Sequence, residues 1–311
     1  MIVSCVIPCH NVEAFVEQAV ASALAQEVPG GMEVIAVDDG STDGTPALLD
    51  ALAARSGGRV RVVHQPNRGA SAARNVGLSL GTGEFVQFLD ADDLLLPGKV
   101  QGQLALAKDG GTDLVVGDYE QVMPNGLLLR VRALAGKPWM ALIRTRMGTT
   151  SSVLWRRSAL VRINGWNEEL ASSQDYELMF RALQGGCAIA WDDRVLTQVL
   201  KRATGSISQT EPIENWKRYI QLRRAMKEHL ERTDAKGFAD EIEALRQYIF
   251  MALRIVAVSD MRWASAMYRS CIGRGFHPEV SKAITERYVF LHNLLGFDGA
   301  ERATRLLKRT R

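Results

Sequence analysis

The chain of 311 residues has only four cysteines and lacks any long apolar run, and both features restrict what it can be. Its longest stretch without a charged residue, residues 1–12, is too short to span a bilayer and lacks the basic start of a signal peptide. Cys5, Cys9, Cys187 and Cys271 form no Cys-x-x-Cys pair. We therefore expect a cytoplasmic protein whose reduced cysteines act as small apolar side chains.

Signatures of two other nucleotide-binding classes are also missing. A nicotinamide-dependent dehydrogenase would have Gly-x-Gly-x-x-Gly after its first strand, but that position reads Pro8-Cys9-His10-Asn11. The sequence has no glycine-rich N-terminal loop followed by Arg and Lys, so a nucleotidyltransferase stays a distant alternative. No recognised nucleic-acid-binding module accompanies the basic residues, and we expect no nucleic-acid partner.

Charge is distributed unevenly along the chain. Residues 1–200 carry 17 Lys and Arg against 22 Asp and Glu, whereas residues 201–311 carry 21 against 13. Basic and aromatic residues alternate in Trp216-Lys217-Arg218-Tyr219, and the chain ends in Lys308-Arg309-Thr310-Arg311. We hypothesise that basic C-terminal helices contact an anionic membrane at its inner face. The alternatives are a solvated helical face and a packing or homodimerisation domain.

Short apolar runs alternate with helical patterns over residues 1–115, which is typical of βαβ units and a parallel sheet in an α/β fold. The pattern predicts strands at residues 2–7, 32–37, 60–63, 85–89 and 114–116, and helices at residues 12–24, 46–54 and 70–80. Residues 116–210 are mixed, with a hairpin predicted around Pro124-Asn125-Gly126 and a helix at residues 173–183. Residues 211–311 are predicted to be almost wholly helical.

Asp90-Ala91-Asp92 follows an apolar strand and is the most informative short motif. Alternate strand residues share a face, so Asp90 and Asp92 can point the same way at the carboxyl end of a strand. Mg²⁺ or Mn²⁺ typically binds one or two carboxylates plus substrate phosphates. The motif indicates a metal and diphosphate site, with turn or helix-capping aspartates as the alternative.

Further polar clusters follow other predicted elements. Asp38-Asp39 ends the second strand, where a carboxylate could accept a hydrogen bond from a nucleobase, or could belong to a capped turn. Arg68 and Arg74 flank the start of a helix, where they could pair with phosphate oxygens or be surface arginines. Ser172 and Asp175 have the spacing of a capping box, but Asp175 could instead be a general base.

Together and in this order, these motifs resemble glycosyltransferase family 2, whose members have the GT-A fold and transfer sugars from nucleotide diphosphates with inversion. The resemblance implies a Rossmann-like domain with a nucleotide-sugar-binding half at residues 1–115, an acceptor-binding and catalytic half at residues 116–210, and a C-terminal helical region at residues 211–311. The matching motifs are Val6-Ile7-Pro8-Cys9-His10-Asn11, Asp38-Asp39-Gly40-Ser41-Thr42-Asp43, Asn67-Arg68-Gly69, Ala73-Arg74-Asn75, Asp90-Ala91-Asp92, Gly165-Trp166-Asn167-Glu168 and Gln174-Asp175.

The resemblance also implies roles on the donor side. Asp39, with Asp38 beside it, would receive the base, usually uracil, and Pro8 and His10 would line the same pocket. Asp90 would contact ribose or sugar. The remaining implied donor-site residues are Asp92 as ligand of Mg²⁺ or Mn²⁺, and Arg68 and Arg74 near the diphosphate.

On the acceptor side, Asp175 matches the catalytic base, and Trp166 and Gln174 would lie near the acceptor. The sequence has Gln174 where many relatives have Glu. The family's later Arg-x-His pattern is Lys201-Arg202-Ala203 in this sequence. Because alanine binds neither metal nor diphosphate, Lys201 or Arg202 would supply the positive charge.

The resemblance therefore implies a metal-dependent hexosyltransferase. It would move one sugar from a nucleotide diphosphate, with UDP favoured, to a glycan or lipid-linked acceptor in cell-surface polysaccharide or glycolipid synthesis. The alternative is a catalytically inactive nucleotide-sugar-binding subunit of a glycan assembly complex. Asp92 and Asp175 argue against it, because a protein without catalysis has no chemical need of either residue.

Overall fold

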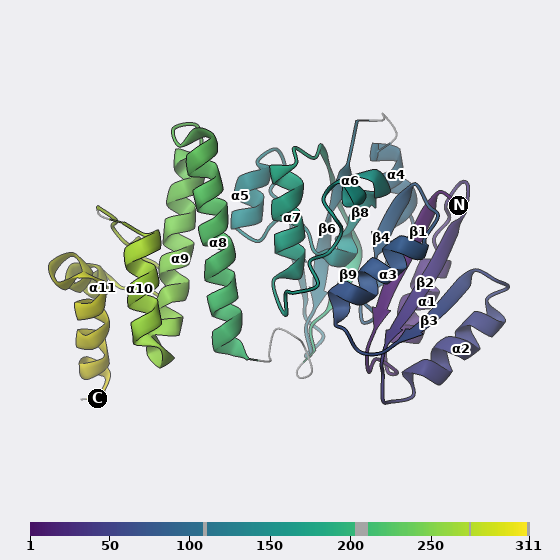
Figure 1. The fold of residues 1–311 in the computed structure, drawn as a ribbon, viewed down its shortest axis with the longest axis horizontal. Coiled ribbons are helices and arrows are strands. Elements are labelled where there is room, and N and C mark those ends of the chain that lie inside the picture. Colours follow the sequence, from purple (N-terminus) through teal and green to yellow (C-terminus); the bar gives the residue numbers. More distant parts are fainter. Residues whose placement is uncertain (108–110, 203–210, 274, 310–311) are drawn as a thin grey trace. The chain divides into compact units, whose positions relative to one another are not determined.

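The computed structural model describes residues 1–107, 111–202, 211–273 and 275–309, with side chains up to residue 307 (Figure 1). The chain divides into two compact units, Met1–Ser206 and Ile207–Arg311. The first unit is built on a sheet and the second on helices. The prediction of an α/β fold with a C-terminal helical region is therefore confirmed.

Within the described residues of the first unit, nine strands form one sheet. The first four strands in space run parallel, so their carboxyl ends lie at one edge. Along the sheet the order is β3 (Val60–Gln65), β2 (Met32–Asp39), β1 (Val3–Cys9), β4 (Phe85–Phe88), β8 (Val153–Arg156), β6 (Leu114–Val122), β9 (Ile189–Leu200) and β5 (Leu94–Leu95), with β7 (Leu128–Val131) paired to β6.

Helices cover both faces of this sheet, which is why the central strands β1, β2 and β4 are almost wholly buried and largely apolar, with Ser4 and Gln87 among their buried polar residues. On one face, helix α1 (Val16–Leu24) buries its apolar stripe against the sheet together with Val100 and Leu104. On the other face Ile35 and Val37 pack on Ala73. The remaining helices of the unit are α2 (Thr45–Arg55), α3 (Ala70–Leu80), α4 (Lys99–Ala107), α5 (Pro138–Ile143), α6 (Arg157–Arg162) and α7 (Gln174–Gln184), with a 3-10 turn at Thr150–Ser152.

The strands and helices expected from periodicity are present, with ends shifted by a few residues. The hairpin around Pro124-Asn125-Gly126 is also present and joins β6 to β7. Strand β8 inserts antiparallel between β4 and β6 and is not predicted by the pattern of the sequence. All four cysteines are buried and unpaired, as expected.

The second unit contains α8 (Pro212–Asp234), α9 (Ala239–Ser259), α10 (Met261–Cys271) and α11 (Glu286–Arg309), the last kinked at Gly296. An aromatic cluster fills its core, in which the ring centroid of Phe250 lies 5.1–6.3 Å from those of its neighbours. The neighbours of Phe250 are Tyr268, Phe276, Tyr288, His292 and Phe297.

None of the described helices combines the length and apolar composition needed to cross a bilayer.

The cations in the basic stretch of α8 interact with carboxylates and an aromatic ring of the second unit. Trp216 and Tyr219 pack against the core, and the Arg223 guanidinium lies 3.4 Å from the centroid of the Tyr219 ring. Membrane contact through these helices therefore stays a prediction, and the ion pairs of α8 do not support it. The basic residues at the end of the chain, from Lys308 on, lie outside the described side chains. The pairs are Lys217 with Glu214 and Asp260, Arg218 with Glu211, Arg224 with Glu228 and Lys227 with Glu231.

A histidine links three elements of the first unit. His64 on β3 lies with Nδ1 2.9 Å from Asp38 Oδ2 on β2 and Nε2 3.1 Å from Asp50 Oδ1 on α2. These hydrogen bonds, first that to Asp38, raise the pKa of His64 above 6.5. Burial would raise the pKa of Asp38, but hydrogen bonds from His64 and Ser41 outweigh it and lower that pKa.

We expect His64→Gln to lower the free energy of unfolding more at about pH 5.5 than at about pH 8.5, because histidine is charged only at the lower value. A histidine whose pKa is higher in the folded than in the unfolded protein stabilises the fold. This contribution is fully present below the unfolded pKa and is lost as the pH rises through the folded pKa. Asp38, with its lowered pKa, stays ionised at both values. Urea titration measures the two differences, and equal differences would contradict the role of the pair.

Candidate active site

The residues singled out from the sequence gather at the carboxyl edge of the parallel strands. Asp39 ends β2 and accepts hydrogen bonds from the backbone of Arg68 and Gly69, just before α3. Arg74 on α3 reaches both Asp90, after β4, and Gln174, the first residue of α7. The structure therefore brings segments from both halves of the first unit to one site.

Asp39 fixes the loop between β3 and α3. Its Oδ1 accepts from Gln65 Nε2 at 2.7 Å and Arg68 N at 2.9 Å, and its Oδ2 accepts from Gly69 N at 2.8 Å. Because each carboxylate oxygen has two lone pairs, Oδ2 keeps capacity for a further donor such as the N–H of a base. Asp38 points elsewhere, to Ser41 N and His64, so the two neighbouring aspartates have separate partners.

His10 lies exposed beside Asp39 at the end of β1. Its Nδ1 is 2.9 Å from the Asp39 carbonyl oxygen, and both ring nitrogens are 3.3 Å from Asn67 Nδ2. Pro8 precedes it on β1 and is half-buried. His10, Asp39 and Asn67 therefore lie next to one another, and a place for Pro8 in the same pocket stays a prediction.

Arg74 occupies the centre of the site and is buried. Its Nη2 donates to Asp90 Oδ1 at 2.7 Å and its Nη1 donates to Gln174 Oε1 at 3.1 Å. The guanidinium carbon lies 4.5 Å from the centroid of the Trp166 ring. Arg74 is therefore bound to protein groups, whereas Arg68, expected in the same role, has a side chain that is 60% exposed and pairs with Glu168.

Asn75 holds the segment that carries Trp166, and the sequence analysis assigned it no role. Its Oδ1 accepts from Trp166 N, and its Nδ2 donates to Trp166 O and Glu168 Oε1, all at 2.8 Å. Gly165 has φ 58°, and a Cβ there would lie 2.7 Å from Asn75 Oδ1. The signal in the sequence that could have pointed to Asn75 is its amide side chain, which directly follows Arg74 in a helix of mostly small residues.

Asp92 and Asp93 have different environments. Asp92 Oδ2 lies 2.7 Å from Arg202 Nε, whose guanidinium also lies over Phe15. Burial and the charge of Asp90 raise the pKa of Asp92, and the neighbouring Arg202 opposes this effect. Asp93 is buried and accepts from Ser151 Oγ at 2.6 Å and Leu200 N at 3.1 Å, which fastens this segment to the end of β9.

The residues around Asp92 can hold a divalent ion only with help from a ligand. Among the described residues no three His, Cys, Asp or Glu side chains are grouped for a metal. Both oxygens of Asp93 are engaged, and Asp90 is paired with Arg74. The donor set of one carboxylate plus diphosphate oxygens fits Mg²⁺ or Mn²⁺. Ala203, at the position of the histidine in the expected Arg-x-His pattern, lies outside the described residues.

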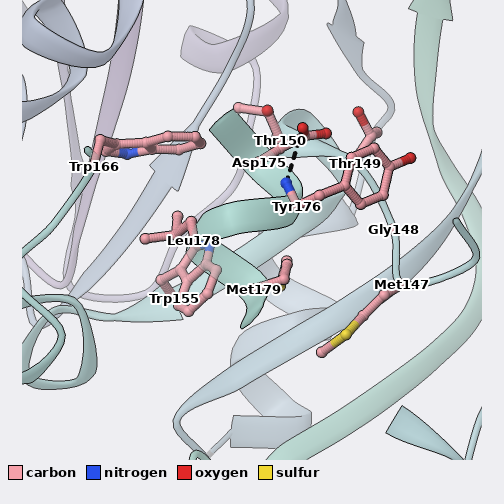
Figure 2. Close-up of a pocket in the computed structure, with 10 residues that line it drawn as sticks. All are labelled: Met147, Gly148, Thr149, Thr150, Trp155, Trp166, Asp175, Tyr176, Leu178 and Met179. Atoms are coloured by element: carbon pink, nitrogen blue, oxygen red, sulfur yellow. Dashed lines mark hydrogen bonds between the residues drawn. The ribbon is translucent and has the colours of Figure 1, made fainter. Parts of the chain in front are cut away.

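Asp175 lies in a recess at the start of α7 (Figure 2). Its Oδ1 accepts from Tyr176 N at 2.9 Å, and neither Ser173, the N-cap residue, nor Ser172 caps the helix through its side chain. The capping-box alternative is therefore wrong. Burial, with the charge of Asp90, raises the pKa of Asp175, which brings the carboxylate nearer to the range of a general base.

Trp166, Tyr176, Thr149 and Thr150 line the same recess, together with Met147 (Figure 2). Aromatic faces and hydroxyl groups beside a carboxylate are suited to hold an alcohol or a sugar. Trp166 also packs edge-on against Phe88 at 5.1 Å between ring centroids. The recess thus contains the predicted acceptor residue Trp166 and the predicted base Asp175, whereas Gln174, the other predicted acceptor residue, is not among its lining residues.

Comparison with known proteins gives this arrangement a family context. The chain is 34% identical over 119 residues to the glycosyltransferase GlyG of Streptococcus pneumoniae, covering 38% of this chain and 39% of that protein. It is 30% identical over 190 residues to a chondroitin synthase of Pasteurella multocida, covering 60% of this chain and 19% of that protein. The aligned parts thus span well under half the length of these relatives.

Solved structures share the fold. Residues 1–349 of TarS of S. aureus, in complex with UDP-GlcNAc, match with a TM-score of 0.69 at 18% identity, covering 100% of this chain and 93% of that one. The mannosyltransferase PcManGT of Pyrobaculum calidifontis, in complex with GDP-Man and Mn²⁺, matches with a TM-score of 0.58 at 19% identity, covering 86% and 78%. The profile of Glycosyl transferase family 2 matches residues 4–162, a region that contains Asp39, Arg74 and Asp92, and the chain belongs to that family.

Proposed function

We propose that the chain is an inverting glycosyltransferase. It moves a hexose from a nucleotide diphosphate, with UDP favoured, to a hydroxyl group of a glycan or lipid-linked acceptor in cell-surface polysaccharide or glycolipid synthesis. The observation that carries this proposal is the juxtaposition of Asp175, whose pKa is raised, with the Asp90–Arg74 pair. The UDP-GlcNAc complex of TarS and the polysaccharide synthases among the relatives support it.

The reaction needs one proton acceptor. As the acceptor oxygen forms its bond to the anomeric carbon, the bond from that carbon to the diphosphate breaks, and Asp175 takes the hydroxyl proton. Attack from the face opposite the diphosphate inverts the anomeric centre. A divalent ion, when bound, neutralises charge on the departing diphosphate. Arg74 keeps Asp90 beside Asp175 and so fixes the donor side relative to the base.

Arg202 has two roles in this proposal. In the structure it pairs with Asp92, the carboxylate that would hold a divalent ion, so Arg202 would compete with that ion for Asp92. Once displaced, the guanidinium is available to the diphosphate, because arginine pairs well with phosphate oxygens. One cation of the chain therefore opposes metal binding before the donor arrives and supports donor binding afterwards.

The donor site predicts metal-dependent binding of one nucleotide. In calorimetric titrations with UDP, GDP and dTDP, each with Mn²⁺ or EDTA, we expect UDP to bind with Mn²⁺ and at least roughly tenfold more weakly with EDTA. Asp92→Ala should remove this metal dependence, and Glu169→Gln, which replaces an exposed carboxylate, should preserve it. Absence of binding by all three nucleotides would contradict the donor site.

The opposing roles of Arg202 give two effects of opposite sign. Arg202→Gln should tighten Mn²⁺ binding without nucleotide by a few-fold, because a partly exposed ion pair contributes on the order of 1 kcal/mol. The same variant should weaken UDP binding at saturating Mn²⁺. Lys201→Gln, at the exposed neighbouring position, is the matched control. Calorimetry measures both constants, and changes in the same direction would refute the exchange of partners.

Asp175→Asn tests the base. We expect kcat to fall by about 10²–10⁴-fold, the usual contribution of a general base, while UDP affinity stays within about twofold. Glu169→Gln should keep wild-type turnover. Product analysis with a panel of UDP-sugars and acceptors measures the rates. Turnover that survives in both Asp175→Asn and Asp92→Ala would favour the non-catalytic subunit over the proposed enzyme.

A further inference from the structure

One stretch of the chain is strongly basic, although the first 200 residues together have a negative net charge. Residues 121–167 contain eight Lys and Arg and no Asp or Glu. Three of these cations are held by neighbouring protein groups. Arg156 pairs with Glu84, Arg157 donates to the carbonyl oxygens of Gly83 and Leu78, and Arg162 pairs with Asp113.

The other five cations are exposed. None of them forms an ion pair with a residue in the described part of the chain. Within the segment of residues 123–146, which we call the basic hairpin segment, they account for all the formal charge. They are Arg130, Arg132, Lys137, Arg144 and Arg146.

The same segment exposes apolar side chains. Leu127, Leu128 and Leu129 are 53%, 50% and 41% exposed, in the turn and the first part of β7. Successive strand residues point to opposite faces, so neither face of this hairpin is covered. Within the described residues β7 pairs only with β6, which leaves its outer edge open. Such an exposed apolar edge is a site of association unless something covers it.

The basic hairpin segment leads to the catalytic base. Tyr119 on β6 pairs in register with Val131 on β7, and burial, with the charge of Asp175 among the further causes, raises the Tyr119 pKa. Arg146 Nε donates to Arg132 O at 2.7 Å. The residues that follow, from Met147 to Thr150, line the recess around Asp175 (Figure 2).

We propose that the basic hairpin segment docks on an anionic phospholipid surface. The five cations would pair with lipid phosphates, and the end of the hairpin, where the three leucines lie on both faces, would enter the apolar layer. A lipid-borne acceptor would then approach the recess of Asp175 from the membrane. This inference rests on the proposed function for the nature of the acceptor, but the docking surface itself depends only on the exposed cations and leucines.

Two other occupants fit less well. A second copy pairing through the β7 edge would bring like charges together, because the unpaired cations lie on the same segment as that edge. A soluble polyanion would match the cations but would leave the three leucines in water. Only a surface with both negative charge and an apolar interior complements both features.

Vesicle flotation of the full chain tests the docking surface. We expect binding to phosphatidylcholine vesicles containing phosphatidylglycerol, loss of binding at high salt, and no binding to phosphatidylcholine alone. Leu127→Ser/Leu128→Ser/Leu129→Ser and Arg130→Gln/Arg132→Gln should each weaken binding at least roughly tenfold. The control Lys217→Gln/Arg224→Gln, which removes two paired cations of α8, should bind as wild type does.

UDP titration of the same samples separates this inference from the proposed function. Both hairpin variants should keep wild-type UDP affinity. A chain that binds UDP and does not float with anionic vesicles would overturn the docking surface alone. Three other results would also overturn it: binding that does not depend on the leucines, equal binding to soluble polyglycerol phosphate, or a dimer that the leucine variant dissociates. Loss of UDP binding in the wild type would instead remove the proposed function.

Discussion

The buried guanidinium of Arg74 is the interaction on which the site depends. A buried cation is costly unless its partners are well placed, and Arg74 finds them on three separate segments: Asp90, Gln174 and the ring of Trp166. These segments belong to the end of β4, the start of α7 and the connection before it. Asp90 compensates the charge of Arg74, and Gln174 and the Trp166 ring add a hydrogen bond and a ring contact, so one common group positions the proposed donor and acceptor sides.

Asp93 adds a second link of the same kind on the other side of Asp92. By accepting from Ser151 and Leu200, it ties the segment after β4 to the 3-10 turn that precedes β8 and to the end of β9. Arg202 lies two residues beyond Leu200, so this link also determines where a cation can meet Asp92. Asp90, Asp92 and Asp93 therefore have three different partners, although they lie within four residues of each other.

Periodicity predicted the parallel half of the sheet because those strands and helices alternate locally along the chain. It did not predict β8, whose pairing with β4 joins residues such as Phe85 and Arg156 that are far apart in sequence. The site shows the same limit. The predicted residues do gather, but the engagement of Arg74 and the roles of Asn75 and Asp93 depend on partners 16 to 107 residues away. Residue type shows what a side chain can bind, and only the fold selects its partner.

Charge illustrates this selection most directly. The C-terminal third has the larger net charge, but in α8 Lys217, Arg224 and Lys227 pair with carboxylates three or four residues away, a spacing that the helix itself brings together. The basic hairpin segment has no carboxylate of its own, and its extended strand offers no such local pairing. Its smaller charge is therefore more available to a partner. The groups that would recognise an anionic surface are unpaired cations beside exposed leucines. The net charge of a segment does not show which of its cations are unpaired.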